Sequence, residues 1–169
     1  QRYPSNSIHY FVRPDGGAAS ALTFLRHICQ SLISLYHLTD VIPDEHVNDV
    51  SSLREIFFQL LKRTSEAPAG RSNKLLIFID GLDESERYAS KEEVITLFLP
   101  LSKDEIPENV LFILSSRPEL EGIENLVDYT LDLKPFTRDE ISLILNRHGW
   151  DQAASGLAFE KSGGEPIYF

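Results

Sequence analysis

Two short segments consist entirely of apolar residues, and they limit the fold more than any other feature of the sequence. Leu75–Ile79 and Val110–Leu114 contain no polar residue and therefore no polar alternation. An alternating strand is covered on one face, whereas an uninterrupted apolar strand is typical of a sheet covered on both faces. Such sheets are mostly parallel, and helices join their strands. The two segments therefore predict an α/β protein with a largely parallel sheet.

Further segments around these two runs fit alternating strands and helices. Ile8–Val12 is an apolar and β-branched run that ends before Pro14, which predicts another strand, and Tyr129–Leu133 predicts a shorter one. Thr137 and Glu140 have the spacing of a helix capping box. Apolar residues three and four positions apart predict helices over residues 18–36, 53–61 and 137–148. Residues 92–101 are also predicted as a helix, and residues 152–161 as a weaker helical stretch.

The length of the chain suits one sizeable core. With 169 residues, it fits one domain, or one domain and the beginning of another. The α/β pattern stops near Pro135, so we expect an α/β core over residues 1–135 and the start of a helical subdomain over residues 136–169. The lack of Met and the start at Gln1 indicate an excised piece of a longer protein.

Composition argues against several classes of function. Acidic residues outnumber basic ones by 26 to 16, and the net charge of -10 opposes attraction to a nucleic-acid backbone. No apolar run approaches the roughly 18 residues of a membrane span, so no membrane insertion is expected. Cys29 is the only cysteine, which excludes an internal disulfide and predicts a reducing compartment, by default the cytoplasm.

Three carboxylates follow the central apolar strand. Asp80 is the first residue beyond the strand, and Asp83 and Glu84 belong to an acidic stretch predicted as a loop over residues 81–90. This is the strand's carboxyl end, where open parallel sheets bind ligands. Mg²⁺ offsets the repulsion within such a cluster, because it prefers hard oxygen ligands and is shared with substrate phosphates. Asp80 is placed to hold the ion, and either Asp83 or Glu84 could orient or deprotonate an attacking water. The alternative is an acidic surface loop.

Two further residues suit a phosphate site. Gly81 lets the backbone approach phosphates without a Cβ in the way. Arg117 follows the strand Val110–Leu114, and a permanent planar cation beside a terminal phosphate distinguishes three phosphates from two and stabilises charge during transfer. The alternative for Arg117 is an ion pair at the strand end with an acidic neighbour.

Three motifs resemble those of a known family. Leu76–Glu84, with the sequence LIFIDGLDE, resembles the Walker B motif of NACHT NTPases, which are STAND-class P-loop proteins related to AAA+ proteins. In that family a small residue and then an acidic pair follow the magnesium-binding Asp, an extension that generic Walker B motifs lack. Ser115-Ser116-Arg117-Pro118 resembles the sensor 1 element, whose Arg approaches the γ-phosphate. Gly164-Glu165-Pro166 resembles the Gly-x-Pro element of STAND proteins, whose Pro lies against the adenine.

The resemblance extends from Ile8 onward and implies a fold, cofactors and site residues. The implied fold is a three-layer α/β sandwich of the P-loop NTPase type, and the implied cofactors are ATP or ADP and Mg²⁺. The resemblance assigns catalysis to Asp83, Glu84 and Arg117, and binding of Mg²⁺ to Asp80. Nucleotide contacts are implied for Asp80, Gly81, Ser116 and Pro166.

One departure from the family pattern is important. No G-x-x-x-x-G-K-[ST] phosphate-binding loop, the Walker A motif, occurs in the chain. Because Ile8–Val12 matches the second strand of the implied fold, the first strand and its P-loop are expected before Gln1. By itself the chain is therefore expected to bind nucleotide poorly and to be inactive as an ATPase.

The implied function is a regulatory switch. A NACHT-type domain binds and slowly hydrolyses ATP with Mg²⁺, and it changes between a closed state and a state competent for oligomerisation. The implied partners are nucleotide, flanking effector and repeat domains of the same protein, and further copies upon activation. The choice of ATP over GTP rests on the family alone. The alternative is a nonhydrolysing protein-interaction scaffold with a degenerate nucleotide pocket.

Overall fold

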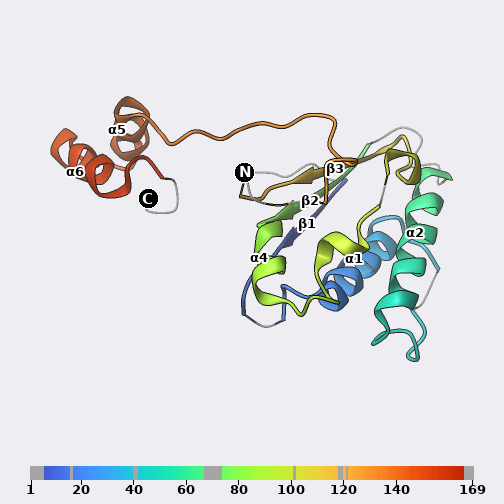
Figure 1. Ribbon diagram of the computed structural model, residues 1–169. Helices are drawn as coiled ribbons and strands as arrows, with labels where there is room; N and C mark the ends of the chain where they lie inside the picture. The colour runs from blue at the N-terminus through green and yellow to red at the C-terminus, as the bar shows by residue number, and fades with distance from the viewer. Residues whose placement is uncertain are drawn as a thin grey trace. The chain divides into compact units, whose positions relative to one another are not determined.

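The computed structural model describes residues 6–15, 17–39, 42–66, 74–100, 102–117, 120 and 122–165. The chain divides into two compact units, Gln1–Val127 and Asp128–Phe169 (Figure 1). The first unit contains the sheet, and the second is a pair of helices. None of the helices in the described part of the chain has the length and apolar character that a bilayer crossing requires.

The first unit is built on a parallel sheet. Its strands are β1 (Ser7–Phe11), β2 (Leu75–Asp80) and β3 (Val110–Leu114), in the spatial order β1-β2-β3. Both pairings are parallel, and Ile79 of β2 lies opposite Leu114 of β3. The predicted α/β class with a parallel sheet is therefore confirmed.

Helices α1 (Ala21–Leu35) and α2 (Val50–Glu66) connect β1 to β2 and pack side by side, and α1 contacts β1 (Figure 1). Three aromatic rings join these layers. The ring of Tyr10 on β1 meets Phe24 on α1 edge-on, with centroids 5.2 Å apart, and Phe24 meets Phe57 on α2 at 6.4 Å. Edge-to-face pairs of this kind add to the stabilisation from apolar burial. The sheet and both helices therefore share one core.

The opposite face of the sheet is less well covered. Phe11, Leu111 and Ile113 are between 40% and 47% exposed. His9 on β1 stacks flat on Phe78 of β2, with the ring centroids 4.6 Å apart. In the described residues, full burial of the strands is thus limited to the face that packs on α1 and α2.

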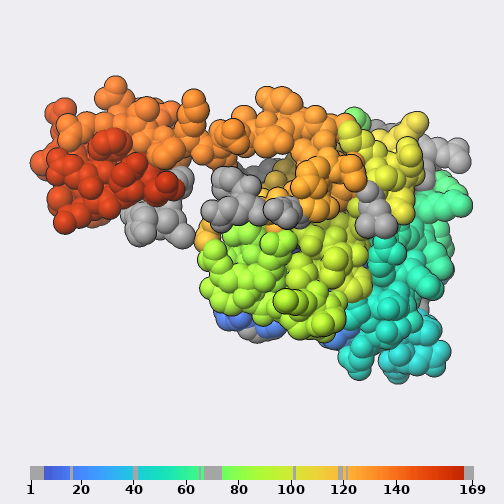
Figure 2. All heavy atoms as spheres, in the orientation of Figure 1, coloured from blue at the N-terminus to red at the C-terminus, as the bar shows by residue number. Residues whose placement is uncertain are grey.

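The connection from β2 to β3 differs from the sequence prediction. The segment 81–90, predicted as a loop, contains the helix α4 (Leu82–Tyr88), and the helix predicted over 92–101 is reduced to a 3-10 turn, η1 (Ile95–Phe98). A second 3-10 turn, η2, spans Lys103–Glu105. In Figure 2 the green and yellow atoms of this connection form one continuous surface beside the cyan atoms of α2.

The contacts of the chain around residue 93 explain the difference. The carbonyl of Glu93 accepts a hydrogen bond from the N–H of Ala21 at 2.8 Å, and Val94 forms a bridge with Ser20. The buried Ser85 hydroxyl accepts from the N–H of Ile95 at 2.9 Å. These backbone groups bond to α1 and α4 and so are not available for a continuous helix of their own.

The second unit contains α5 (Arg138–Arg147) and α6 (Gln152–Ser162). Both helices were predicted, and the capping box of Thr137 and Glu140 is confirmed. The strand predicted over Tyr129–Leu133 is wrong, because this segment has no regular secondary structure and its three apolar side chains are between 68% and 85% exposed. It alternates as a strand does, but no strand among the described residues pairs with it.

The first prediction concerns the aromatic core. Replacing the fully buried Phe57 with Ala should lower the free energy of unfolding of the first unit by about 3–5 kcal/mol, because it leaves a cavity between α2 and α1. Leu97→Ala, at a largely exposed side chain of η1, should change it by less than about 0.5 kcal/mol.

Cys29 provides the measurement. It lies fully inside this core, and burial raises the pKa of its thiol to about 12, so a thiol reagent at pH 8 should react only after the unit opens. Labelling as a function of urea concentration then reports the stability of the first unit alone. Equal effects of the two substitutions would contradict the packing described above.

Candidate functional site

The ends of β2 and β3 meet at the carboxyl edge of the sheet. Asp80, the last residue of β2, is exposed, and Ser115 follows the last residue of β3. The Ser115 hydroxyl donates a hydrogen bond to Oδ1 of Asp80 and accepts one from the N–H of Gly81 at 3.0 Å. The carbonyl of Ser115 also accepts a hydrogen bond from the N–H of Leu82 at 2.8 Å. Ser115 therefore holds the turn in which Asp80 lies.

Gly81 allows the backbone conformation that this turn requires. Its φ is +75°, in the left-handed region, and it is the N-cap of α4. A Cβ at this position would meet the carbonyl of Val12 at 3.5 Å, which is ordinary contact. Backbone conformation, more than lack of space, thus explains the glycine.

Helix α4 places two more carboxylates beside Arg117. Asp83 and Glu84 lie in its first turn, where the helix dipole favours negative charge. Asp83 accepts the backbone N–H of Arg117 at 3.2 Å, and its other oxygen lies 3.5 Å from the guanidinium Nε. Glu84 Oε1 lies 3.1 Å from Nη2 of the same guanidinium. The side chain of Arg117 is 51% exposed, against 15% for Asp83 and 21% for Glu84.

The charges of this cluster suit a partly hydrated divalent cation. The carboxylates of Asp80, Asp83 and Glu84 outnumber the single guanidinium of Arg117, and Oδ2 of Asp80 receives no hydrogen bond from the described residues. No group of three or more metal-ligating side chains converges in the described part of the chain. Mg²⁺ commonly binds through one or two carboxylates and takes its other ligands from water and phosphates. Asp80 fits that role, and a cation enclosed by protein ligands does not fit here.

The structure brings together most of the residues that the sequence singled out. Asp80, Gly81, Asp83, Glu84 and Arg117 lie in one cluster at the sheet edge. The hydroxyl of Ser116 donates instead to the carbonyl of Arg117 at 2.9 Å. Pro166 lies outside the described residues, so its predicted contact with the adenine stays a prediction.

Ser115 is the residue that the sequence prediction of the site left out. A signal for it exists, because Asp80 and Ser115 are the first polar residues after two apolar runs of equal length. Parallel strands in register bring such residues together.

Gly164, from the predicted Gly-x-Pro element, has a structural role in the second unit. Its carbonyl accepts the N–H of Phe136 at 2.9 Å, its φ is +91°, and a Cβ there would lie 2.3 Å from the carbonyl of Phe136. The chain thus closes tightly after α6 against the residue preceding Thr137. This contact accounts for the glycine without any nucleotide.

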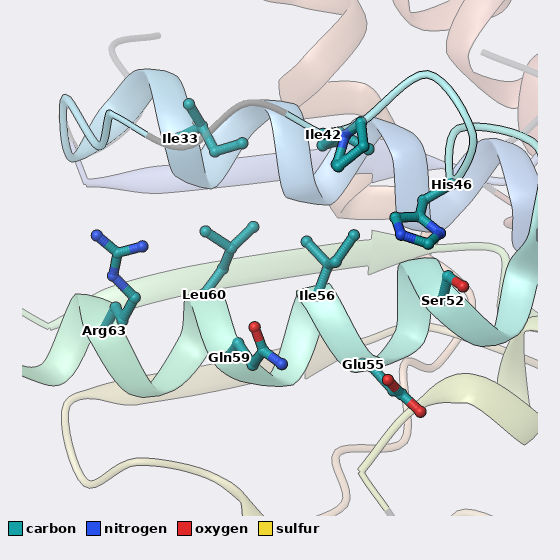
Figure 3. Close-up of a pocket in the computed structure, with 10 residues that line it drawn as sticks. Ile33, Ile42, His46, Ser52, Glu55, Ile56, Gln59, Leu60 and Arg63 are labelled. Atoms are coloured by element: carbon teal, nitrogen blue, oxygen red, sulfur yellow. The ribbon is translucent and has the colours of Figure 1, made fainter.

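A hollow in the described residues lies away from these groups. It has a volume of about 350 Å³ and is formed by α2, the end of α1 and the segment 42–46 (Figure 3). Leu60 points toward Ile33 and Ile56 toward Ile42, so that the lining is partly apolar, and the rim has mixed charge. It gathers no nucleophile or carboxylate cluster. We therefore place the candidate site at the sheet edge, on its chemistry.

Taken together, these features define an α/β domain with a parallel sheet whose carboxyl edge gathers carboxylates, a glycine turn and an arginine. A family model described as "Nephrocystin 3, N-terminal" matches residues 2–117, a range that covers all three strands and ends at Arg117. The chain belongs to this family. Comparisons with curated proteins and with solved structures found no match.

The conformation of Gly81 generates a second prediction. Gly81→Ala should destabilise the first unit by about 1–2 kcal/mol, since alanine disfavours the left-handed conformation. Gly81→Asn should lose less, because asparagine adopts that conformation more readily. Urea unfolding followed by Cys29 labelling measures both. Equal losses would indicate that the added side chain, and not φ, causes the damage.

A third prediction separates a structural ion pair from a functional arginine. Because the guanidinium of Arg117 is half exposed, its pairs with Asp83 and Glu84 should contribute less than about 1 kcal/mol. Arg117→Ala should therefore leave the midpoint of urea unfolding nearly unchanged, as should Arg117→Lys, which keeps the charge. A loss above about 2 kcal/mol for Arg117→Ala would show that the ion pair is part of the fold.

Proposed function

We propose that this domain is a NACHT-type nucleotide-binding module that binds and slowly hydrolyses ATP with Mg²⁺. The observation that carries the proposal is the cluster at the carboxyl edge, where Asp80 ends the central strand and Arg117 lies against Asp83 and Glu84. Membership of the nephrocystin 3 N-terminal family is compatible with this activity and does not by itself specify it.

Each residue has a role suited to its position. Asp80 would hold Mg²⁺, which supplies neutralisation of phosphate charge. The N–H of Gly81 donates to the Ser115 hydroxyl, and with its backbone held in this way Gly81 would lie beside the phosphates. Either Asp83 or Glu84 would orient or deprotonate the attacking water. Arg117 would contact the terminal phosphate.

The ion pairs of Arg117 suggest how this site responds to a third phosphate. The guanidinium contacts Glu84 at 3.1 Å and is half exposed. A terminal phosphate competes with the carboxylates for the same planar donors, because bidentate phosphate contacts are strong. Transfer of Arg117 to the phosphate would leave Glu84 or Asp83 as an acceptor for water. A nucleotide diphosphate lacks the group that draws Arg117 away.

The wider role proposed is a signalling switch. Nucleotide would control a change between a closed state and one that self-associates, with effector and repeat domains of the same protein as partners, in the cytoplasm. The free, buried thiol of Cys29 is compatible with a reducing compartment. The preference for ATP over GTP is part of the proposal and is tested with both.

A second function is a protein-interaction scaffold without hydrolysis. One observation favours it, namely the exposed apolar residues Phe11, Leu111 and Ile113 on the sheet. A scaffold does not require Asp83 and Glu84 next to Asp80, which is why the switch is the better proposal.

The fourth prediction tests the switch in the full-length natural protein. Asp80→Ala should abolish Mg²⁺-dependent binding of a fluorescent ATP analogue. Glu84→Gln and Asp83→Asn should both keep nucleotide binding. Whichever of the two removes the group that activates water should lower turnover by at least about 100-fold. Both residues are tested because either suits the role.

The matched control is Glu86→Gln, which makes the same charge change on the exposed side of α4. It should leave binding and turnover unchanged. A full-length protein that binds neither ATP nor GTP would end the ATPase proposal and leave the scaffold.

A further inference from the structure

The hydroxyl of Ser115 forms hydrogen bonds with two residues of the candidate site, Asp80 and Gly81. It accepts the N–H of Gly81 at 3.0 Å and donates its own proton to Oδ1 of Asp80. Its backbone is fixed as well, since its N–H donates to Ile79 at 2.9 Å and its carbonyl accepts from Leu82 at 2.8 Å. The hydroxyl position is therefore set by the sheet and by the turn after β2.

This arrangement constrains how Asp80 presents its carboxylate. An exposed aspartate at a strand end can rotate about its side-chain bonds, and each rotation changes which oxygen faces the ligand. The bond from Ser115 engages Oδ1, and Oδ2 receives no hydrogen bond from the described residues. One oxygen is thus held by the protein while the other is left for a cation or its water.

Ser116 does not offer the same contact. Its hydroxyl donates to the carbonyl of Arg117 at 2.9 Å and has no bond to Asp80 in the described residues. Side chains alternate along an extended chain, so only one of two adjacent serines faces the end of β2. The structure distinguishes two residues that the sequence motif presents as equivalent.

We propose that Ser115 is a positioning residue for Asp80, fixing the carboxylate so that Oδ2 binds the divalent cation that accompanies nucleotide. This inference rests on the proposed function for its biological meaning. Even without nucleotide, removal of the Ser115 hydroxyl should weaken cation binding at Asp80. Partners that orient metal ligands commonly change metal affinity or activity by about 10- to 100-fold when they are removed.

The test uses the 169-residue chain and Mn²⁺ alone. Broadening of the backbone amide signals of Gly81 and Leu82 in ¹⁵N-resolved NMR spectra gives the Mn²⁺ concentration at half effect. Ser115→Ala should raise that concentration by about 10-fold. Ser115→Thr, which keeps a hydroxyl, should restore the wild-type value, and Asp80→Asn should abolish the site-specific broadening.

Ser85→Ala is the control for a purely structural effect. The Ser85 hydroxyl also accepts a backbone N–H, from Ile95 at 2.9 Å, and donates to the carbonyl of Ala19 at 2.7 Å, but it does not contact Asp80. This substitution should lower the thermal midpoint without changing the Mn²⁺ titration. If Ser115→Ala behaves in the same way, or if the wild type shows no broadening near Gly81, the inference is overturned.

Nucleotide binding by the full-length protein separates this result from the proposed function. Ser115-dependent Mn²⁺ binding without any nucleotide binding would preserve the positioning role and end the ATPase proposal. If the full-length protein binds nucleotide and Ser115→Ala leaves the Mn²⁺ titration unchanged, the nucleotide-binding proposal is kept and the positioning role of Ser115 is overturned. In a protein that does bind ATP, Ser115→Ala should weaken the Mg²⁺-dependent part of the affinity and leave the Mg²⁺-independent part unchanged.

Discussion

The candidate site depends on the parallel register between β2 and β3. Ile79 lies opposite Leu114, so the two apolar runs end together and the next residues, Asp80 and Ser115, become neighbours. A slip of one residue would reverse the faces of every side chain on one strand and separate the carboxylate from the hydroxyl. The register is maintained by apolar burial against α1 and α2, which lie on the far side of the backbone from His9 and Phe78. Core packing thus determines which polar groups meet at the edge.

Much of the fold could be predicted from side-chain periodicity, because periodicity reports which residues are buried. It identified the three strands and the helices α1, α2, α5 and α6. It could not predict where backbone groups find partners. The acidic segment forms α4 because Gly81 adopts a left-handed conformation and donates its N–H to the Ser115 hydroxyl. The carbonyl of Glu93 accepts the N–H of Ala21, so the chain there does not continue as a helix. Tyr129–Leu133 alternates correctly but finds no strand among the described residues.

The residues of the site could largely be predicted from the sequence, but the contacts between them could not. The acidic residues and Arg117 follow two apolar strands, and a parallel sheet brings strand ends together. Which serine binds Asp80 depends on the direction of one side chain, and the motif contains two serines in succession. The pairing of Arg117 with Asp83 and Glu84 was foreseen only as an alternative, because an arginine beside carboxylates serves equally as an ion pair and as a phosphate ligand.

The charges and exposure of this cluster bear on the ligand role that we propose for it. The half-exposed guanidinium of Arg117 is expected to contribute little to stability, while carboxylates that outnumber it repel one another. The N-terminus of α4 supplies partial positive charge to Asp83 and Glu84, yet the helix is short and the effect is confined to its first turn. Asp80, exposed at the strand end, gains nothing from Arg117 in the described contacts. A cluster that is expected to stabilise the fold weakly, and that still contains excess negative charge, is compatible with the cation and phosphates of the proposed function.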